Sequence, residues 1–315
     1  MIIVTGGAGF IGSCIVKGLN DLGISNIIIV DELGTDEKWK NLVNLKYKDF
    51  IHKNNFLEEL KLMKNIDLII HMGACSSTTE TDSDYLIDNN FKYSKELFDW
   101  CLKNNCRLIY ASSAATYGDG SIGYDDSKTD ELKPLNMYGY TKKLFDQYVL
   151  NSENKPKQCV GLRFFNVYGP NEYHKGKMAS VIFHSFNQIK KEKEIKLFKS
   201  YKKEYSDGEQ KRDFVYVKDT VEVVLFMMKN DKINGIFNVG TGEARSFNDL
   251  ARSVFKAMNL KENIKYVDMP QGLKEKYQYY TQANIEKLRK AGYKKKFYSL
   301  EEGTKDYVCK YLEKM

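Results

Sequence analysis

The first half of the chain alternates short apolar runs, rich in β-branched residues, with longer amphipathic stretches. Short apolar runs predict buried strands, and apolar residues spaced three and four apart predict helices. The expected strands cover residues 2–5, 26–30, 67–71, 107–112 and 159–165, and the expected helices cover residues 11–22, 84–103 and 138–150. Because strands that alternate with helices feed a parallel sheet, the pattern predicts a Rossmann-type, doubly wound α/β fold.

This alternation breaks after residue 170, where loops, a helix near residues 178–191 and a lysine-rich stretch at 199–211 follow. The apolar segments 213–217 and 235–240 then look like a return to the sheet or its flanks. We therefore expect a larger domain of residues 1–165, completed by roughly 212–240. A smaller, interleaved C-terminal α/β domain should be formed mainly by residues 166–315.

Composition narrows the class of protein. The 315 residues are 42% hydrophobic and 29% charged, and they contain no apolar run of the length that spans a bilayer. The N-terminus has neither a basic leader nor a cleavable apolar segment. Six cysteines occur without CxxC pairs or zinc spacing, which favours reduced thiols and no metal site. We expect a cytoplasmic protein with no membrane partner.

The formal charge of +7 would suit a nucleic-acid partner. However, the lysines are spread through amphipathic segments and mixed with acids, as in residues 190–194, which is typical of solvated helix faces. The sequence therefore argues against nucleic-acid binding.

A glycine-rich turn, Gly6-Gly7-Ala8-Gly9-Phe10-Ile11-Gly12, follows the first strand and opens the first helix. Glycines there permit a tight turn and let backbone N–H groups approach a pyrophosphate at the helix N-terminus. Strand, turn and helix occur in the required order, so the segment predicts dinucleotide binding through Gly6, Gly9 and Gly12.

Asp31 closes the second strand, where a carboxylate can accept the adenosine ribose hydroxyls. An acid at this position favours NAD, because it would repel the 2′-phosphate of NADP. Lys38 follows in the same loop and could neutralise that phosphate. The residues alone leave NAD and NADP open.

Tyr138 and Lys142 are four residues apart and therefore share one face of a helix. A nearby ammonium, together with the positively charged nicotinamide of a cofactor, lowers the pKa of a phenol and favours its use as a base. Ser113 ends the strand at 107–112 and could hold the same reacting oxygen. Together with the glycine turn, this triad predicts hydride transfer to a nicotinamide cofactor.

These motifs resemble the extended short-chain dehydrogenase/reductase superfamily. Within it, the chain is similar to the family of ADP-L-glycero-D-manno-heptose 6-epimerases, which complete ADP-heptose for the lipopolysaccharide inner core. The resemblance rests on MIIVTGGAGFIG (1–12), GACSSTT (73–79), YASSAATYG (110–118), FNVYGP (165–170), HKGKMAS (174–180), KRDFVYV (211–217) and YQYYTQA (277–283).

The resemblance implies NADP as the cofactor, an ADP-heptose substrate and a homo-oligomer, commonly a pentamer. It implies cofactor contacts from Phe10, Ile11, Asp31, Glu32, Lys38, Lys53, Met72, Gly73, Ala74, Cys75, Ser76, Asn89, Lys142 and Val167. It implies substrate contacts from Asn166, Lys177, His184, Phe198, Lys199, Ser200, Tyr201, Arg212 and Tyr277.

The resemblance also makes Tyr138 and Lys175 the two acid/base residues, assisted by Ser113. Hydride removal gives a ketone at C6″, and hydride return to its other face needs an acid on each side. Without the resemblance, the local sequence predicts that Lys175 is a solvated loop lysine.

Two features depart from this family. Glu32 adds a second acid beside the expected 2′-phosphate, and the stretch 199–210 is long and highly charged. A UDP-glucose 4-epimerase and a non-catalytic NADP-binding regulator stay as alternatives. A 4,6-dehydratase does not, because its Asp-Glu pair is absent after Ser113.

Overall fold

A seven-stranded parallel sheet is the centre of the fold. The computed structural model describes residues 1–272, 274 and 277–315. The sheet order is β10-β6-β5-β4-β1-β2-β3, and every pairing is parallel. Its strands are β1 (Ile2–Thr5), β2 (Ile27–Asp31), β3 (Asp49–His52), β4 (Leu68–His71), β5 (Arg107–Ser113), β6 (Gln158–Phe164) and β10 (Gly235–Val239). The predicted doubly wound fold is confirmed.

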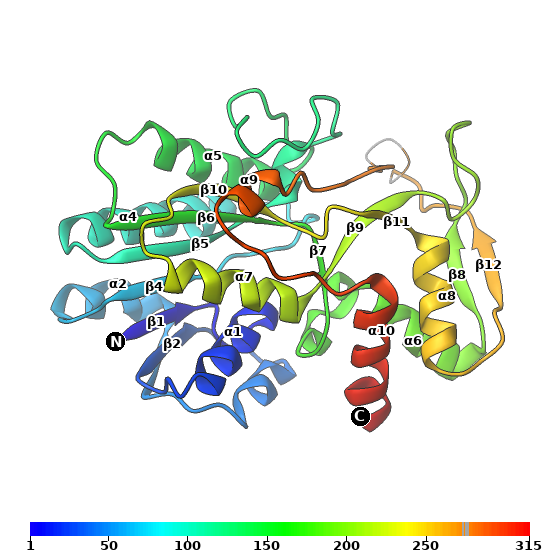
Figure 1. Cartoon of the computed structure of the whole chain (residues 1–315), viewed down its shortest axis with the longest axis horizontal. Helices are drawn as coiled ribbons and strands as arrows, with labels where there is room; N and C mark the ends of the chain where they lie inside the picture. Colours follow the sequence, from blue (N-terminus) through cyan, green and yellow to red (C-terminus); the bar gives the residue numbers. More distant parts are fainter. Residues whose placement is uncertain (273, 275–276) are drawn as a thin grey trace.

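Helices cover both faces of this sheet (Figure 1). One face packs against α1 (Phe10–Asp21) and α7 (Val217–Lys229), with Val4 in their shared core. The other face packs against α2 (Lys53–Leu62), α4 (Tyr93–Lys103) and α5 (Met137–Asn151), with Ile3 in that core. Successive strand residues thus point to opposite cores, as the two-residue period of a strand requires.

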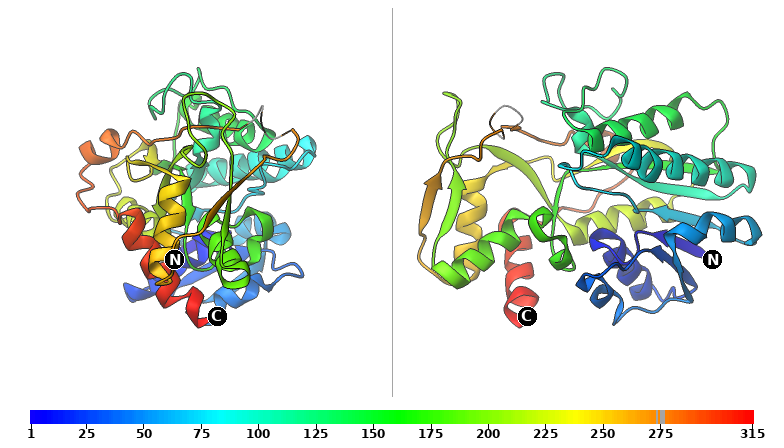
Figure 2. Two further views of the ribbon diagram at one scale, coloured as in Figure 1. Left: turned by 90° about the vertical axis from the view of Figure 1, so that its right-hand side faces the viewer. Right: turned by 180° about the vertical axis from the view of Figure 1, so that it is seen from behind.

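A smaller α/β unit lies beside the carboxyl ends of the large sheet (Figures 1 and 2). A three-stranded sheet has the order β11-β9-β7, and a two-stranded sheet pairs β12 with β8. The strands are β7 (Asn166–Tyr168), β8 (Ile195–Phe198), β9 (Lys211–Tyr216), β11 (Ala244–Ser246) and β12 (Ile264–Val267). The helices are α6 (Val181–Glu192), α8 (Phe247–Ala257) and α10 (Leu300–Lys310), whereas α9 (Glu286–Lys290) lies beside β10 of the large sheet (Figure 1).

The chain crosses between the two units more than once. It leaves the large sheet after β6, forms β7, α6, β8 and β9 in the smaller unit, and returns through α7 and β10. The segment expected at 235–240 joins the large sheet as β10, whereas the segment at 213–217 falls mostly in β9 of the small sheet.

The helix expected at 84–103 is wrong in one respect. It is divided into α3 (Ser83–Leu86), a π-helical segment η2 (Ile87–Lys92) and α4. A π-helical turn inserts an extra residue and re-aims the side chains around it, which is common at functional sites. In this chain the re-aimed side chain is Asn90, whose contacts are described below.

Other predicted elements end within a few residues of the observed ones, but the short pair β3–α2, the elements β7, β8 and α7, and the elements after β10 were not predicted. Among the residues that the structure describes, no helix is long and apolar enough to cross a membrane.

Candidate active site

A cavity of about 690 Å³ lies at the carboxyl ends of β1, β2, β4 and β5 and reaches the start of α6. Strand order reverses between β1 and β4, since the chain runs outward to β2 on one side and to β5 on the other. Ligands of open α/β sheets bind at such a switch point. The cavity therefore lies where a parallel sheet of this kind places its ligand.

The glycine turn forms one wall of this cavity. Gly6 has a φ of +66°, and a Cβ there would lie 2.6 Å from the backbone nitrogen of Gly73. A Cβ on Gly12 would collide with the carbonyl oxygen of Gly6. Helix α1 begins after Gly9 without any side-chain cap, which leaves its first N–H groups available for an anion. The turn meets the steric and electrostatic demands of a pyrophosphate site.

Both acids at the end of β2 are paired with lysines. Asp31 accepts hydrogen bonds from the backbone of Ala8 at 2.9 Å and from Lys38 Nζ at 3.1 Å. Glu32 forms an ion pair with Lys53 at 3.0 Å. The negative charges of two carboxylates are therefore balanced by the positive charges of two ammonium groups at this end of the cavity. This balance does not decide between NAD and NADP.

The loop after β4, which contains Cys75, is held by Asn90 of the π-helical segment. The Asn90 side chain accepts from Cys75 N at 2.8 Å, donates to Cys75 O at 3.0 Å and donates to Thr141 Oγ1 at 3.3 Å. It is 1% exposed. Asn90 was not predicted, because its partners are remote in sequence and asparagine inside a helical pattern carries no signal.

His71 was also missed. Burial of the imidazole, together with the nearby charge of Lys142, lowers the pKa of His71 to about 3. The ring lies 2.6 Å from Thr5 Oγ1 and 2.8 Å from Ser94 Oγ. Because Ser94 donates its proton to the carbonyl of Asn90, the ring must donate to Ser94 and accept from Thr5. His71 is therefore a neutral link between β1, β4 and the π-helical segment.

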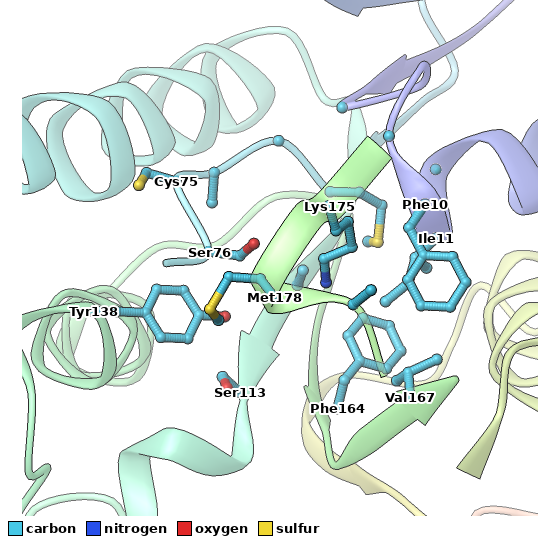
Figure 3. A pocket seen from close by; sticks show the side chains of 18 of the residues that line it. Phe10, Ile11, Cys75, Ser76, Ser113, Tyr138, Phe164, Val167, Lys175 and Met178 are labelled. Carbon is cyan, nitrogen blue, oxygen red and sulfur yellow. The ribbon is translucent and has the colours of Figure 1, made fainter. Parts of the chain in front are cut away.

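Tyr138 reaches Ser113 because α5 begins close to the end of β5. Asn136 caps α5 by accepting from Gly139 N at 2.8 Å. A Cβ on Gly139 would lie 2.6 Å from the carbonyl oxygen of Ala115, so only glycine lets the helix approach this closely. Tyr138 and Ser113 consequently face each other across the cavity floor (Figure 3).

Burial dominates the electrostatics of Tyr138 and Lys142. Burial raises the pKa of Tyr138, while the Ser113 hydrogen bond lowers it. Lys142 donates to the carbonyl of Ala111 at 2.9 Å, and burial lowers the pKa of this lysine to about 8, against the opposing charge of Asp146. In the protein by itself, the desolvation of the phenolate outweighs the hydrogen bond from Ser113. The lowering expected from Lys142 together with a positively charged nicotinamide concerns the site with its cofactor bound, and it stays a prediction.

Lys175 enters the cavity from η4 (Tyr173–Met178), a different element from the one that carries Tyr138 (Figure 3). Its ammonium lies 5.5 Å from the centroid of the Phe10 ring. Burial lowers the pKa of Lys175, and the charge of Glu172 opposes that effect. Lys175 is thus a partly desolvated lysine in the same cavity as Tyr138 and Ser113. It is not the solvated loop lysine that the local sequence suggests.

Every residue predicted for the cofactor lines this cavity, and so do Ser113, Tyr138 and Lys175. Of the predicted substrate residues, Asn166 lines it as well. Three others, Phe198, Arg212 and Tyr277, form a cluster. The Arg212 guanidinium lies 5.2 Å from the ring centroid of Tyr277, and the ring centroids of Phe198 and Tyr277 are 6.4 Å apart. Arg212 also lies over Phe247, which is part of the cavity wall, so the cluster adjoins the cavity.

The other predicted substrate residues do not line the cavity among the described residues: Lys177, His184, Lys199, Ser200 and Tyr201. The backbone N–H of Ser200 instead donates to Asp207, within the charged stretch 199–210, and the Tyr201 hydroxyl donates to Asp268, which follows β12.

The cavity also has walls that the sequence analysis missed: Thr5, Val30, Tyr85, Tyr93, Ala111, Ser112, Phe164, Phe165, Tyr168, His174, Met178, Ala179, Ser180, Val181, Ile182, Phe214, Phe247 and Leu250. Most are apolar, and apolar residues at strand ends look the same in sequence whether they fill a core or line a site.

Comparisons with known proteins agree with this geometry. A family model described as the NAD dependent epimerase/dehydratase family matches residues 2–240. The chain is 54% identical to the ADP-L-glycero-D-manno-heptose-6-epimerase of Fusobacterium nucleatum, over 100% of this chain and 98% of that protein.

Two solved structures are similar throughout. The ADP-L-glycero-D-manno-heptose-6-epimerase of Helicobacter pylori has a TM-score of 0.84 and 30% identity, over 98% of this chain and 94% of that one. A UDP-N-acetylglucosamine 4-epimerase from Methanobrevibacter ruminantium has a TM-score of 0.85 and 27% identity, over 100% and 98%. With its Rossmann sheet, glycine turn and Ser-Tyr-Lys site, the chain belongs to the NAD dependent epimerase/dehydratase family.

Proposed function

We propose that this protein is an ADP-glyceromanno-heptose 6-epimerase, which converts ADP-D-glycero-β-D-manno-heptose to ADP-L-glycero-β-D-manno-heptose. The observation that carries the proposal is the 54% identity, over the whole chain, to a relative of that name. Shape does not discriminate, because a 4-epimerase of 27% identity superposes as well. A UDP-hexose 4-epimerase is therefore the competing activity in the test.

The large sheet supplies the dinucleotide site in this proposal. The turn around Gly6, Gly9 and Gly12 would hold the pyrophosphate at the uncapped start of α1. Residues 1–165, completed by α7 and β10, would then bind the cofactor, and residues 166–315 would mainly bind the sugar nucleotide. A nicotinamide held there would supply reversible hydride transfer at C6″ of the heptose.

The chain's own residues handle the protons. Tyr138 removes the proton of the C6″ hydroxyl, and Ser113 holds the same oxygen by a hydrogen bond. Lys142, whose ammonium lies one helical turn from Tyr138, stabilises the phenolate as the proton leaves. After the sugar has turned to present its other face, Lys175 protonates the oxygen of the inverted carbon. Two acid/base groups on different elements are what an inversion without an adjacent carbonyl requires.

We propose NADP rather than NAD as the natural cofactor. Lys38 and Lys53 are the two cations at the adenosine end of the cavity, and each can leave its carboxylate for a 2′-phosphate. Mass spectrometry of the nucleotide that copurifies with the protein tests this choice. Copurified NAD alone would contradict it.

The family resemblance further supports a cytoplasmic homo-oligomer, with five subunits, that serves synthesis of the lipopolysaccharide inner core. Light scattering after size-exclusion chromatography measures the subunit number.

The activity is tested by incubating the purified protein with ADP-D-glycero-β-D-manno-heptose and following the C6″ stereocentre by NMR. We expect inversion without added cofactor, because the hydride is returned. UDP-galactose, incubated in parallel, should stay unchanged. No inversion of the heptose together with turnover of UDP-galactose would replace the proposal with the 4-epimerase.

The residue roles have their own test. Tyr138→Phe and Lys175→Met should each lose about 10²–10⁴-fold in kcat while retaining dinucleotide, since each removes one acid/base group. Lys191→Met is the control, because Lys191 is an exposed lysine in the last turn of α6 and belongs to no predicted site. Wild-type turnover in the Lys175 variant would rule out the two-residue mechanism.

A further inference from the structure

Lys175 lies in a loop that runs from Gly169 to Ser180, the N-cap of α6. The loop contains only the 3₁₀ segment η4, and its backbone reverses at Gly176, where φ is +52°. A single 3₁₀ turn has few internal hydrogen bonds. The position of the Lys175 side chain therefore depends on contacts that the loop makes with other groups.

The Glu172 carboxylate supplies contacts at both ends of this loop. It accepts from the backbone N–H of Gly169 at 3.3 Å, from the backbone N–H of Ser180 at 2.5 Å and from Ser180 Oγ at 2.7 Å. Glu172 is 1% exposed, and its own carbonyl accepts from Lys175 N at 3.0 Å. One buried side chain thus joins the start of the loop to its end, with Lys175 between them.

Charge links the same two residues. Glu172 is the negative group that opposes the effect of burial on the pKa of Lys175. Burial raises the pKa of Glu172 itself, and the hydrogen bonds from Ser180 and Gly169 favour its charged form. The groups that face Glu172 from neighbouring elements are Cys14 of α1 and Tyr307 of α10, and burial raises the pKa of both, so both stay neutral. Tyr173, in the loop itself, is neutral for the same reason.

Lys175 also has a titratable neighbour, His174. Burial lowers the pKa of His174, and Asp36, Lys38 and Asp31 act on it from the segment after β2. Because an imidazole is either neutral or cationic, His174 cannot replace the negative charge that Glu172 provides.

We propose that Glu172 is the positioning residue of Lys175: its buried carboxylate closes the 169–180 loop and supplies the counter-charge for the Lys175 ammonium. The role of that ammonium as a catalytic acid rests on the proposed function, whereas the pairing of the two residues does not. Without Glu172, burial would lower the pKa of Lys175 further, so a larger share of the lysine would meet the sugar oxygen as a free amine, with no proton to give. If Glu172 served only to hold the N-terminus of α6, its removal would leave the protonation of Lys175 unchanged.

Two substitutions separate the two parts of the proposal. Glu172→Gln keeps the length of the side chain and removes its charge. Glu172→Asp keeps the charge, but it is one methylene too short to reach both Gly169 and Ser180. Asp219→Asn is the control, because Asp219 is another buried carboxylate that holds a backbone N–H, that of Tyr298, and it lies on α7.

The first readout is the pH dependence of Lys175 acetylation by trace acetic anhydride, measured by mass spectrometry of the Lys175 peptide. Lys290, whose side chain is 80% exposed, serves as the internal standard. We expect Glu172→Gln to move the labelling midpoint of Lys175 to lower pH and to raise its labelling at pH 7 by about threefold or more. Glu172→Asp and Asp219→Asn should keep the wild-type midpoint.

An unchanged labelling midpoint of Lys175 in Glu172→Gln would refute the claim that Glu172 supplies the counter-charge of Lys175. Because acetylation needs no substrate, this result is distinct from a failure of the proposed epimerase activity.

The second readout is turnover. Glu172→Asp should lose about 10-fold or more in kcat with little change in KM, because the loop no longer holds the ammonium in place. A wild-type kcat in Glu172→Asp would refute the claim that Glu172 positions Lys175 by closing the loop. This test holds even if Glu172→Gln fails to fold.

Discussion

The buried ion pair between Arg163 and Asp146 offers a sharp test of what holds the active site together. Arg163 lies on β6 and Asp146 on α5, both side chains are 0% exposed, and they are joined at 2.9 Å. Asp146 also accepts from Ser112 Oγ at 2.8 Å and from Tyr110 OH at 3.0 Å. The pair therefore joins β6 to the helix that carries Tyr138 and Lys142, and the two hydroxyl contacts of Asp146 add the strand that ends at Ser113.

Arg163→Met removes the cation and leaves the carboxylate buried with two hydroxyl donors. Removing one partner of a buried pair costs about 3–5 kcal/mol, because the remaining charge cannot return to water. At about 2 °C per kcal/mol for a chain of this size, Tm should fall by about 6–10 °C. Arg252→Met is the control, since Arg252 and its partner Glu262 are 49% and 56% exposed. An exposed pair contributes only about 0–1 kcal/mol.

Urea unfolding followed by circular dichroism measures both variants. A double-mutant cycle with Asp146→Asn then isolates the pair, and we expect a coupling free energy of about 1–3 kcal/mol. Additive single-mutant effects, or a loss below 1 kcal/mol for Arg163→Met, would refute the reasoning that the pair is fully desolvated.

Three further predictions follow from single residues. Gly12→Ala should abolish dinucleotide binding in an isothermal titration, because its Cβ would collide with the Gly6 carbonyl, whereas Gly23→Ala, with nothing within 4 Å of its Cβ, should bind normally. Asn90→Asp should weaken dinucleotide binding about tenfold and cost about 1–3 kcal/mol, because it removes the donor to the Cys75 carbonyl; normal binding would contradict this. Burial raises the pKa of Asp219 to about 7, so this group contributes stability that is present at low pH and lost as pH rises to about 7. Asp219→Asn still accepts from Tyr298 N but cannot ionise. The Tm of this variant minus the Tm of wild type should therefore increase from pH 4 to pH 8, and a Tm difference that does not change with pH would exclude the effect.

Local patterns explain why much of the fold was predictable. Buried parallel strands are continuous apolar runs, and a glycine turn between strand and helix has a spacing that few other structures need. Tyr138 and Lys142 share a helix face for the same local reason. Each of these features depends on residues within one element, so the sequence displays it directly.

The missed residues share the opposite property. Asn90, His71 and Glu172 are buried polar groups whose roles depend on atoms from other elements or from both ends of a loop. The predicted substrate set shows the same difficulty, since Lys177 and His184 follow the family pattern but do not line the cavity among the described residues.

By itself, the sequence determined the alternation of strands and helices, the dinucleotide turn and the family, because each is written in short, contiguous patterns. Only the tertiary structure decided that Lys175 is partly desolvated, that burial raises the pKa of Tyr138, and that Glu172 joins the two ends of the Lys175 loop. The physical reason is desolvation. Burial sets the charge of an ionisable group, and burial depends on elements that are distant in sequence.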